Sequence, residues 1–324
     1  MRKYHSSGKI IEVSINELDF IPGPFCMSFV QDLSKLERSI HQNGLMHLPC
    51  VVKNDMGSID IVTGYRRLKA LQNMGENLVS CLDLTECNCT GLELLLFNFY
   101  ENFSIRAFNA IEKGMLLIRL RRYLTRDEIL AQYMPLLDLP AYEEILEMYI
   151  RLDNYESEFK GAIANGIISL KSVDLVGRMQ IDEISAIFRA IMKCKFNKNQ
   201  QIRFIEYVQD LSIMEEKPIT NILADPGLKE IMENKDDNKP QKSKQVLTYL
   251  KSKRFPRLTE EEKRFRAAIG QLRLPSGSRI KSDNSFEEKY FCLEILFEDG
   301  PDLLSKLELI NSCEELAYIK GIPG

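Results

Sequence analysis

The chain has 324 residues, of which 44% are hydrophobic and 28% charged, which is enough for two or three globular domains. Its net charge of −4 excludes a protein that is basic over its whole surface. No apolar run is long enough to span a bilayer, no apolar leader segment begins the sequence, and eight cysteines are scattered along it. We therefore expect a cytoplasmic protein that does not bind membranes.

The charge is unevenly distributed in the last quarter of the chain. Residues 242–281 carry twelve Lys and Arg against three Glu, and residues 282–324 carry ten acids against three Lys. A basic segment followed by an acidic one is compatible with nucleic-acid binding by the first, or with pairing between the two.

The first 90 residues show strand and helix patterns in alternation. The predicted elements are a strand over 10–18, a helix over 32–41, strands over 49–53 and 59–63 that form a hairpin around 54–58, a helix over 64–74 and a strand over 78–84. From Gly91 onward the periodicity is helical. Helices are predicted over 92–104, 109–123, 125–133, 141–152, 156–165, 169–178, 181–193 and 197–211.

These patterns predict an α+β fold: a small mixed-sheet domain, an all-helical domain with a helix-turn-helix, and a small C-terminal α+β module. Polar residues with Pro and Asn around 232–244 are typical of a linker. The predicted boundaries are 1–90 for the sheet domain, 91–230 for the helical domain, 231–244 for the linker and 245–324 for the module.

The stretch from Thr63 to Ala70 has the chemistry of a phosphate site. A predicted strand ends at Thr63, Gly64 allows close backbone approach, and Arg66 and Arg67 enter a helix. Guanidinium groups make charge-assisted bonds to phosphate oxygens. The alternative is an ordinary solvated helix start, which is the commoner origin of such a pattern.

A second polar group closes an apolar helix. Glu101 and Asn102, followed by Arg106, offer a carboxylate and a carboxamide for Mg²⁺ or for a phosphate-bound water. The alternative interpretation is the polar fringe of a helix end.

In combination these motifs resemble the N-terminal family of ParB partition proteins, over roughly residues 10–212. The resemblance rests on the order and spacing of three boxes: Ser39-Ile40-x-x-x-Gly44-Leu45-x-x-x-Pro49, Gly64-x-Arg66-Arg67-x-x-Ala70 and Glu101-Asn102-x-x-x-Arg106-x-x-Asn109-x-x-Glu112. In that family these boxes bind cytidine triphosphate (CTP) with Mg²⁺.

The resemblance implies a dimeric, nucleotide-dependent switch in DNA partition, plasmid or phage maintenance, or transcription regulation, with possible weak nucleoside triphosphatase activity. It assigns Glu101 to Mg²⁺ and to catalysis. The nucleotide-binding residues that it implies are Gly64, Tyr65, Arg66, Arg67, Asn102 and Arg106.

Three departures from the family pattern affect that expectation. Tyr65 stands where the family has Glu, the Asn102-to-Arg106 spacing is one residue longer, and the loop 21–29 lacks the family's Asn-Pro and Arg. Phosphate binding thus carries over better than cytidine selectivity or hydrolysis. Two alternatives remain open: a phosphotransferase or nuclease on the same fold, with Glu101 or Asp60 as base, and an adaptor or regulator that has lost nucleotide binding.

DNA contact is expected from the basic segment rather than from the helix-turn-helix. The second helix of that motif, 141–152, carries three Glu and one Arg, which disfavours contact with phosphates. Basic residues interleaved with Phe255 and Phe265 are candidates for DNA contact: Lys253, Arg254, Arg257, Arg264 and Arg266. The alternative is that the basic segment pairs with the acidic tail.

Cys81, Cys87 and Cys89 lie close together without a fourth ligand nearby in the sequence. A tetrahedral zinc site needs four ligands, so we expect ordinary thiols and no structural metal.

Overall fold

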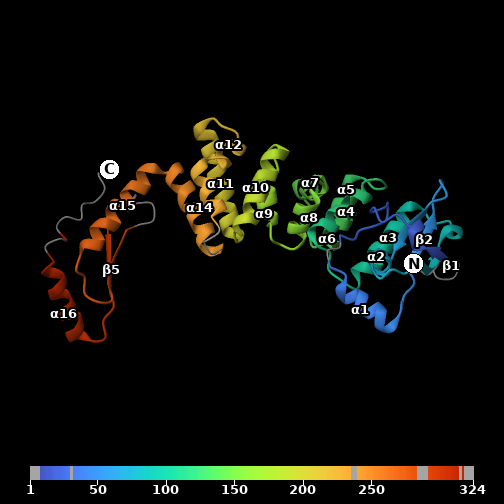
Figure 1. The fold of residues 1–324 in the computed structure, drawn as a ribbon, viewed down its shortest axis with the longest axis horizontal. Coiled ribbons are helices and arrows are strands. Elements are labelled where there is room, and N and C mark those ends of the chain that lie inside the picture. The colour runs from blue at the N-terminus through green and yellow to red at the C-terminus, as the bar shows by residue number, and fades with distance from the viewer. Residues whose placement is uncertain (1–7, 30–31, 235–238, 283–290, 314–315, 317–324) are drawn as a thin grey trace. The chain divides into compact units, whose positions relative to one another are not determined.

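The computed structural model describes residues 8–29, 32–234, 239–282, 291–313 and 316 (Figure 1). Contacts divide the chain into two compact units, 1–179 and 180–324. Both contain helices and strands, and the predicted α+β class is confirmed. Among the described residues, no helix combines the length and the apolar character needed to cross a membrane.

A four-stranded mixed sheet forms the core of the first unit. Its strands are β1 (Lys9–Ser14), β2 (Cys50–Lys53), β3 (Ile59–Thr63) and β4 (Leu78–Asp83), in the order β1-β4-β2-β3. Strands β2 and β4 are parallel, and the other neighbours are antiparallel. The hairpin predicted around 54–58 is confirmed, because Asn54 N donates to Ser58 O at 2.9 Å and closes the turn between β2 and β3.

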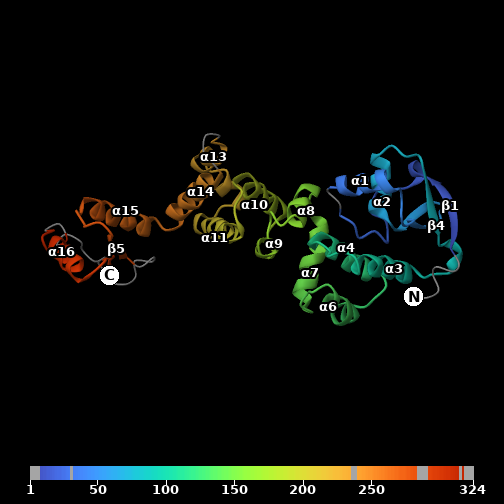
Figure 2. The same cartoon turned by 90° about the horizontal axis from the view of Figure 1, so that it is seen from below.

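Helices α1 (Ser34–Asn43) and α2 (Tyr65–Asn73) lie side by side, as Figure 2 shows. Leu68 of α2 is fully buried in the core that Val51 and Ile61 of the sheet share. Burying such apolar side chains is the main stabilising contribution to this half of the unit.

Helices complete the first unit. They are α3 (Gly91–Phe103), α4 (Ala110–Leu120), α5 (Arg126–Glu128), α6 (Met134–Leu136), α7 (Glu143–Arg151), α8 (Ser157–Ala164) and α9 (Leu170–Val176), with a π-helical turn over Ile129–Tyr133. Capping boxes begin α3 at Thr90 and α4 at Asn109. Helices α4 and α7 cross closely, since a Cβ on Gly114 would lie 2.5 Å from the Tyr149 carbonyl oxygen.

The first unit therefore extends beyond the boundary predicted at residue 90. Helix α3 packs against β3, and Arg119 of α4 donates to the Gly23 carbonyl at 2.9 Å. These long-range contacts join the sheet and the helices up to Met179 into one body.

The second unit starts with a helical array, in which α11 packs against α12 and α14. Its elements are α10 (Ile181–Cys194), α11 (Lys198–Glu215), α12 (Ile219–Leu223), α13 (Pro226–Glu233), α14 (Lys239–Arg254), α15 (Pro256–Gln271), β5 (Ser278–Ser282), β6 (Phe291–Ile295) and α16 (Gly300–Asn311).

The segment predicted to be a linker, 231–244, differs in the structure. Helix α13 continues to Glu233 and α14 begins at Lys239, while 235–238 lie outside the described residues. Met232 and Ser243 are buried within this segment, where α13 and α14 pack together, so tertiary packing outweighs the polar composition that indicated a linker.

The α+β module predicted at the C-terminal end begins after α14. Strands β5 and β6 pair antiparallel, and Phe265 of α15 stacks on Phe291 of β6 with ring centroids 5.0 Å apart.

Candidate functional site: an arginine-lined cavity

A cavity of about 1120 Å³ opens beside α2 and α3 in the first unit. Its lining includes every residue that the sequence assigned to nucleotide or Mg²⁺ binding: Gly64, Tyr65, Arg66, Arg67, Glu101, Asn102 and Arg106. Residues of two motifs that are separated by 34 residues, counted from Arg67 to Glu101, thus line one space.

Gly64 occupies a position that only glycine fits well. Its φ of +86° is left-handed, and an added Cβ would lie 2.8 Å from Pro49 Cβ and 2.9 Å from Pro49 Cα. The residue is the N-cap of α2, so the helix starts at the cavity wall. The backbone geometry predicted for a close approach to a ligand is present here.

Arg66 has no hydrogen bond or ion pair among the residues that the structure describes, and its Nε is buried without a partner. Burial lowers the pKa of Arg66 from its ordinary value, and the nearby charge of Arg106 lowers it further, while Glu112 opposes the shift. A guanidinium stays charged despite such a shift. The cavity therefore contains a positive charge whose donors are not satisfied by the protein.

Arg106 also lines this cavity and has a second unsatisfied donor. Its Nε donates to Asn102 Oδ1 at 3.3 Å and its Nη1 to Glu112 Oε2 at 2.6 Å, whereas its buried Nη2 has no partner. The guanidinium also lies over the Phe108 ring, 4.9 Å from its centroid. Two like charges, each with an unpartnered N–H, thus line one space, and an anion between them would be stabilised.

Arg67 is arranged differently from Arg66. Its Nη2 forms an ion pair with Glu101 Oε1 at 3.1 Å, and its Nη1 donates to the His47 carbonyl at 2.6 Å. Asn102 is likewise engaged, because its Nδ2 donates to Asn98 Oδ1 at 2.6 Å. Both residues line the cavity, but they mainly position their neighbours.

The Tyr65 hydroxyl is bonded within the protein rather than offered to a phosphate. The hydroxyl donates to the Phe20 carbonyl at 2.7 Å, and the two rings pack edge to face at 6.1 Å. Burial raises the pKa of Tyr65. The residue that departs from the family pattern thus anchors the loop after β1.

Glu101 is the one carboxylate among the described residues that line the cavity, and its buried Oε2 has no hydrogen-bond partner. Mg²⁺ in nucleotide sites is often held by one or two carboxylates together with phosphate oxygens. An orphaned carboxylate oxygen beside two arginines fits that donor set. The Thr63 hydroxyl is also buried there, without a hydrogen-bond partner in the described structure.

The rim of the cavity is apolar. Met46 and Ile105 line it and are 78% and 77% exposed, and Ile10 is also exposed. Exposed apolar side chains beside a charged interior suit a ligand that has both an anionic and an apolar part.

Asn98 takes part in the site, although the sequence analysis did not predict a role for it; Glu112, the last residue of the third box, and His47 take part as well. Asn98 is a lone amide within the apolar run 92–100, and a polar residue in such a run is a signal of a buried polar contact. His47 contributes its backbone carbonyl, which no sequence pattern indicates.

The basic residues proposed for DNA contact lie in the second unit, and most are paired with acids. Lys253 pairs with Asp225 at 3.2 Å, Arg254 with Asp210, Arg264 with Glu260 and Glu261, and Arg266 with Glu262 at 3.7 Å. Arg257 is exposed and has no ion pair among the described residues. Pairing with the acidic tail occurs at Glu294, which contacts Arg279 and Lys281.

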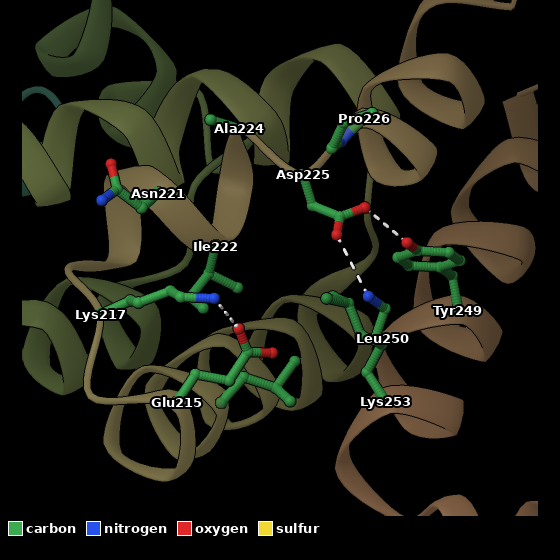
Figure 3. A pocket seen from close by; sticks show the side chains of 11 residues that line it. Glu215, Lys217, Asn221, Ile222, Ala224, Asp225, Pro226, Tyr249, Leu250 and Lys253 are labelled. Atoms are coloured by element: carbon green, nitrogen blue, oxygen red, sulfur yellow. Dashed lines mark hydrogen bonds and ion pairs between the residues drawn. The ribbon is translucent and has the colours of Figure 1, made fainter.

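A smaller cavity of about 320 Å³ surrounds Lys253 (Figure 3). Asp225 accepts bonds there from the Tyr249 hydroxyl and from Lys253 Nζ. Burial and this carboxylate raise the pKa of Tyr249, and the bond to Asp225 raises that of Lys253. These two bonds join Asp225, the N-cap of α13, to α14.

Cys81 is buried in the sheet, where burial raises its pKa to about 12, while Cys87 and Cys89 lie after β4. Within the described ranges no group of three or more His, Cys, Asp or Glu is placed to hold a metal ion.

Comparison with known proteins gives structural matches only. No family model matches the chain, and no curated protein matches it. The C-terminally truncated chromosome-partitioning protein ParB from Caulobacter crescentus, complexed with CTP-gamma-S, is similar at 20% identity and a TM-score of 0.27, over 57% of this chain and 99% of that one. The same protein complexed to the centromeric parS site is similar at 15% identity and a TM-score of 0.31, over 59% and 96%.

Proposed function

We propose that this chain is a nucleotide-binding, DNA-associated protein that holds the phosphates of a nucleoside triphosphate between Arg66 and Arg106. The observation that carries the proposal is that both arginines line this cavity and that each has a buried N–H without a partner in the described structure. Glycine at position 64 and the start of α2 lie in the same wall and favour an anion there.

The energetics favour an anionic ligand over an empty site. A buried donor without a partner costs about 1–3 kcal/mol, and more when the group is charged. Arg66 and Arg106 also repel each other, as the lowered pKa of Arg66 reflects. A phosphate between them satisfies both donors and removes the repulsion, whereas a neutral ligand would leave the repulsion in place.

Glu101 would hold Mg²⁺ through its free Oε2 while Arg67 stays on Oε1. The ion would supply further neutralisation of the phosphates. Glu101 is also the candidate for positioning a water in a weak nucleoside triphosphatase reaction, because it is the carboxylate at the cavity among the described residues.

The apolar rim would take the nucleoside. Met46 and Ile105 offer apolar surface beside the charged interior. CTP is the first nucleotide to test, because the boxes around Arg66 and Glu101 resemble those of the ParB family and because a similar ParB structure is a complex with CTP-gamma-S.

DNA would be contacted from the second unit, where Arg257 is exposed and unpaired in the described part of the chain. Binding of nucleotide in the first unit would change the affinity for DNA or the association of two copies. The protein would act in the reducing cytoplasm, where its eight free cysteines would stay reduced. Light scattering with and without nucleotide tests for the homodimer.

A thermal-shift panel tests the proposed function. The four ribonucleoside triphosphates with Mg²⁺ are compared on the parent chain and on Arg66→Met, with Arg38→Met on α1 as a matched control. We expect at least one nucleotide to raise the melting temperature of the parent and of the control, but not of Arg66→Met. If no nucleotide stabilises the parent, the chain is an adaptor or regulator without nucleotide binding.

A further inference from the structure

Glu112 connects the arginine-lined cavity beside α2 and α3, called the anion cavity below, to a segment that lies before α1. This carboxylate, at the start of α4, is only 3% exposed. Its Oε2 accepts from Arg106 Nη1 at 2.6 Å and from Asn109 N at 3.1 Å, and its Oε1 accepts from Phe29 N at 3.2 Å. Burying a carboxylate costs several kcal/mol unless a charge compensates it, and the contact shows that Arg106 does so.

A second connection from Arg106 reaches the same segment. Arg106 Nε donates to Asn102 Oδ1, and Asn102 Nδ2 donates to Asn98 Oδ1. Asn98 Nδ2 in turn donates to the Phe25 carbonyl at 2.7 Å. Asn98 is buried, so an unsatisfied group in this chain of bonds would be costly.

Both connections end on the backbone of residues 25–29. One holds the Phe29 amide and the other holds the Phe25 carbonyl. Within this stretch, Phe25, Cys26 and Met27 are all buried. The stretch therefore depends on Arg106 at both of its ends, although it does not itself contain an arginine.

We propose that Arg106 couples occupancy of the anion cavity to the segment Phe25–Phe29, with Glu112 and Asn98 as positioning residues. This inference rests on the proposed function, because it assigns the cavity to a phosphate-bearing ligand. The remaining donor of Arg106, Nη2, is buried and unpartnered in the described structure, and it is the donor that we assign to the anion, so that Glu112 keeps its bond to Nη1.

The coupling has a defined sign. A ligand anion on Nη2 and Glu112 on Nη1 hold the guanidinium from two sides, which restricts the Arg106 side chain. Opening of the segment breaks the bond between the Phe29 amide and Glu112 or the bond between Asn98 and the Phe25 carbonyl. The buried polar atoms of Glu112 or Asn98 are then left unsatisfied. A bound anion therefore makes opening of residues 25–29 rarer, and the Phe29 amide exchanges its hydrogen more slowly.

Hydrogen exchange of peptides covering residues 20–29, followed by mass spectrometry, tests this coupling. Without ligand, we expect Arg106→Met and Glu112→Gln each to speed exchange of the Phe29 amide by roughly tenfold or more, because each removes a charge-assisted bond. Arg121→Met is the matched control, since Arg121 lies at the end of the same helix as Glu112 but pairs with the exposed Glu147 at 3.6 Å. The control should exchange like the parent.

Inorganic tripolyphosphate is the probe for the coupling itself. It should slow exchange at Phe29 in the parent and in Arg121→Met, but not in Glu112→Gln, in which calorimetry should still detect binding. Unchanged exchange in both Arg106→Met and Glu112→Gln would overturn the coupling whatever the ligand does. Tight binding by the parent with no slowing at Phe29 would overturn it too and leave the proposed function intact. Absence of binding to the parent would contradict the proposed function and the coupling together, and faster exchange in Arg106→Met would then show only that Arg106 holds the segment.

Discussion

Arg67 Nη2 and Glu101 Oε1 lie 3.1 Å apart, and this ion pair separates the roles of two neighbouring arginines. Arg66 is free in the described structure, whereas Arg67 neutralises the carboxylate at the cavity wall. The sequence predicted phosphate binding by both arginines, whereas in the structure Arg67 pairs with a carboxylate and Arg66 does not.

The first prediction concerns this division between the arginines. Arg67→Met should weaken tripolyphosphate binding by about tenfold, because it leaves the Glu101 charge uncompensated next to the anion. The double variant Arg67→Met/Glu101→Gln should recover most of the lost affinity. Adding Glu101→Gln to Arg66→Met should recover little of the affinity that Arg66→Met loses. Titration calorimetry without Mg²⁺ gives the affinities of the parent and of the four variants. A double variant no better than Arg67→Met would mean that Arg67 binds the ligand directly.

The second prediction concerns Mg²⁺. Adding the ion should strengthen nucleoside triphosphate binding by the parent, since the free Oε2 of Glu101 becomes a ligand. Glu101→Gln should bind the nucleotide in the absence of Mg²⁺ and gain little when the ion is added. The comparison uses matched titrations with Mg²⁺ and with a chelator. An equal gain in parent and variant would exclude Glu101 as the ligand.

The third prediction concerns the close approach at Gly64. Gly64→Ala should lower the free energy of unfolding by about 3 kcal/mol or more, because the left-handed φ adds to a collision with Pro49. Gly75→Ala is the matched control, with a φ of +80° and no atom within 4 Å of the added Cβ. It should cost only about 1 kcal/mol from the backbone strain. Urea denaturation compares the two, and equal losses would contradict the packing assigned to Gly64.

The fourth prediction concerns DNA. Arg257→Ala should weaken DNA binding and reduce the salt-dependence slope by about one, as expected for loss of one phosphate contact. Arg264→Ala should change the slope less, because Arg264 already pairs with Glu260 and Glu261. Fluorescence anisotropy at several salt concentrations measures both slopes. A larger change for Arg264 would locate the DNA surface elsewhere.

The elements of the first unit were predictable because their apolar periodicity is strong. The hairpin around 54–58 and the helix after Gly64 lie where turn residues and glycine indicate them. Helix α14 was not predicted as one element, since its first residues are polar and only packing through Val246 and Leu250 shows that it is a core helix.

The sequence predicted which arginines line the candidate site, but not which hydrogen-bond partners they have. The motifs placed Arg66, Arg67 and Arg106 near one another, and the structure places all three on the cavity. Which donor remains free depends on the side-chain neighbours, such as Glu112 on Arg106 and Phe20 on Tyr65. Those contacts span 6 and 45 residues, and sequence spacing alone does not determine them.

Calorimetric titration of the parent chain and of Arg66→Met/Arg106→Met with nucleoside triphosphate tests the central claim most directly. The account predicts one site in the parent and a loss of at least roughly a hundredfold in affinity in the double variant, because two charge-assisted contacts are removed. Circular dichroism should show that the variant keeps its helices. Equal affinity in the two proteins would contradict the assignment of the cavity as the phosphate site.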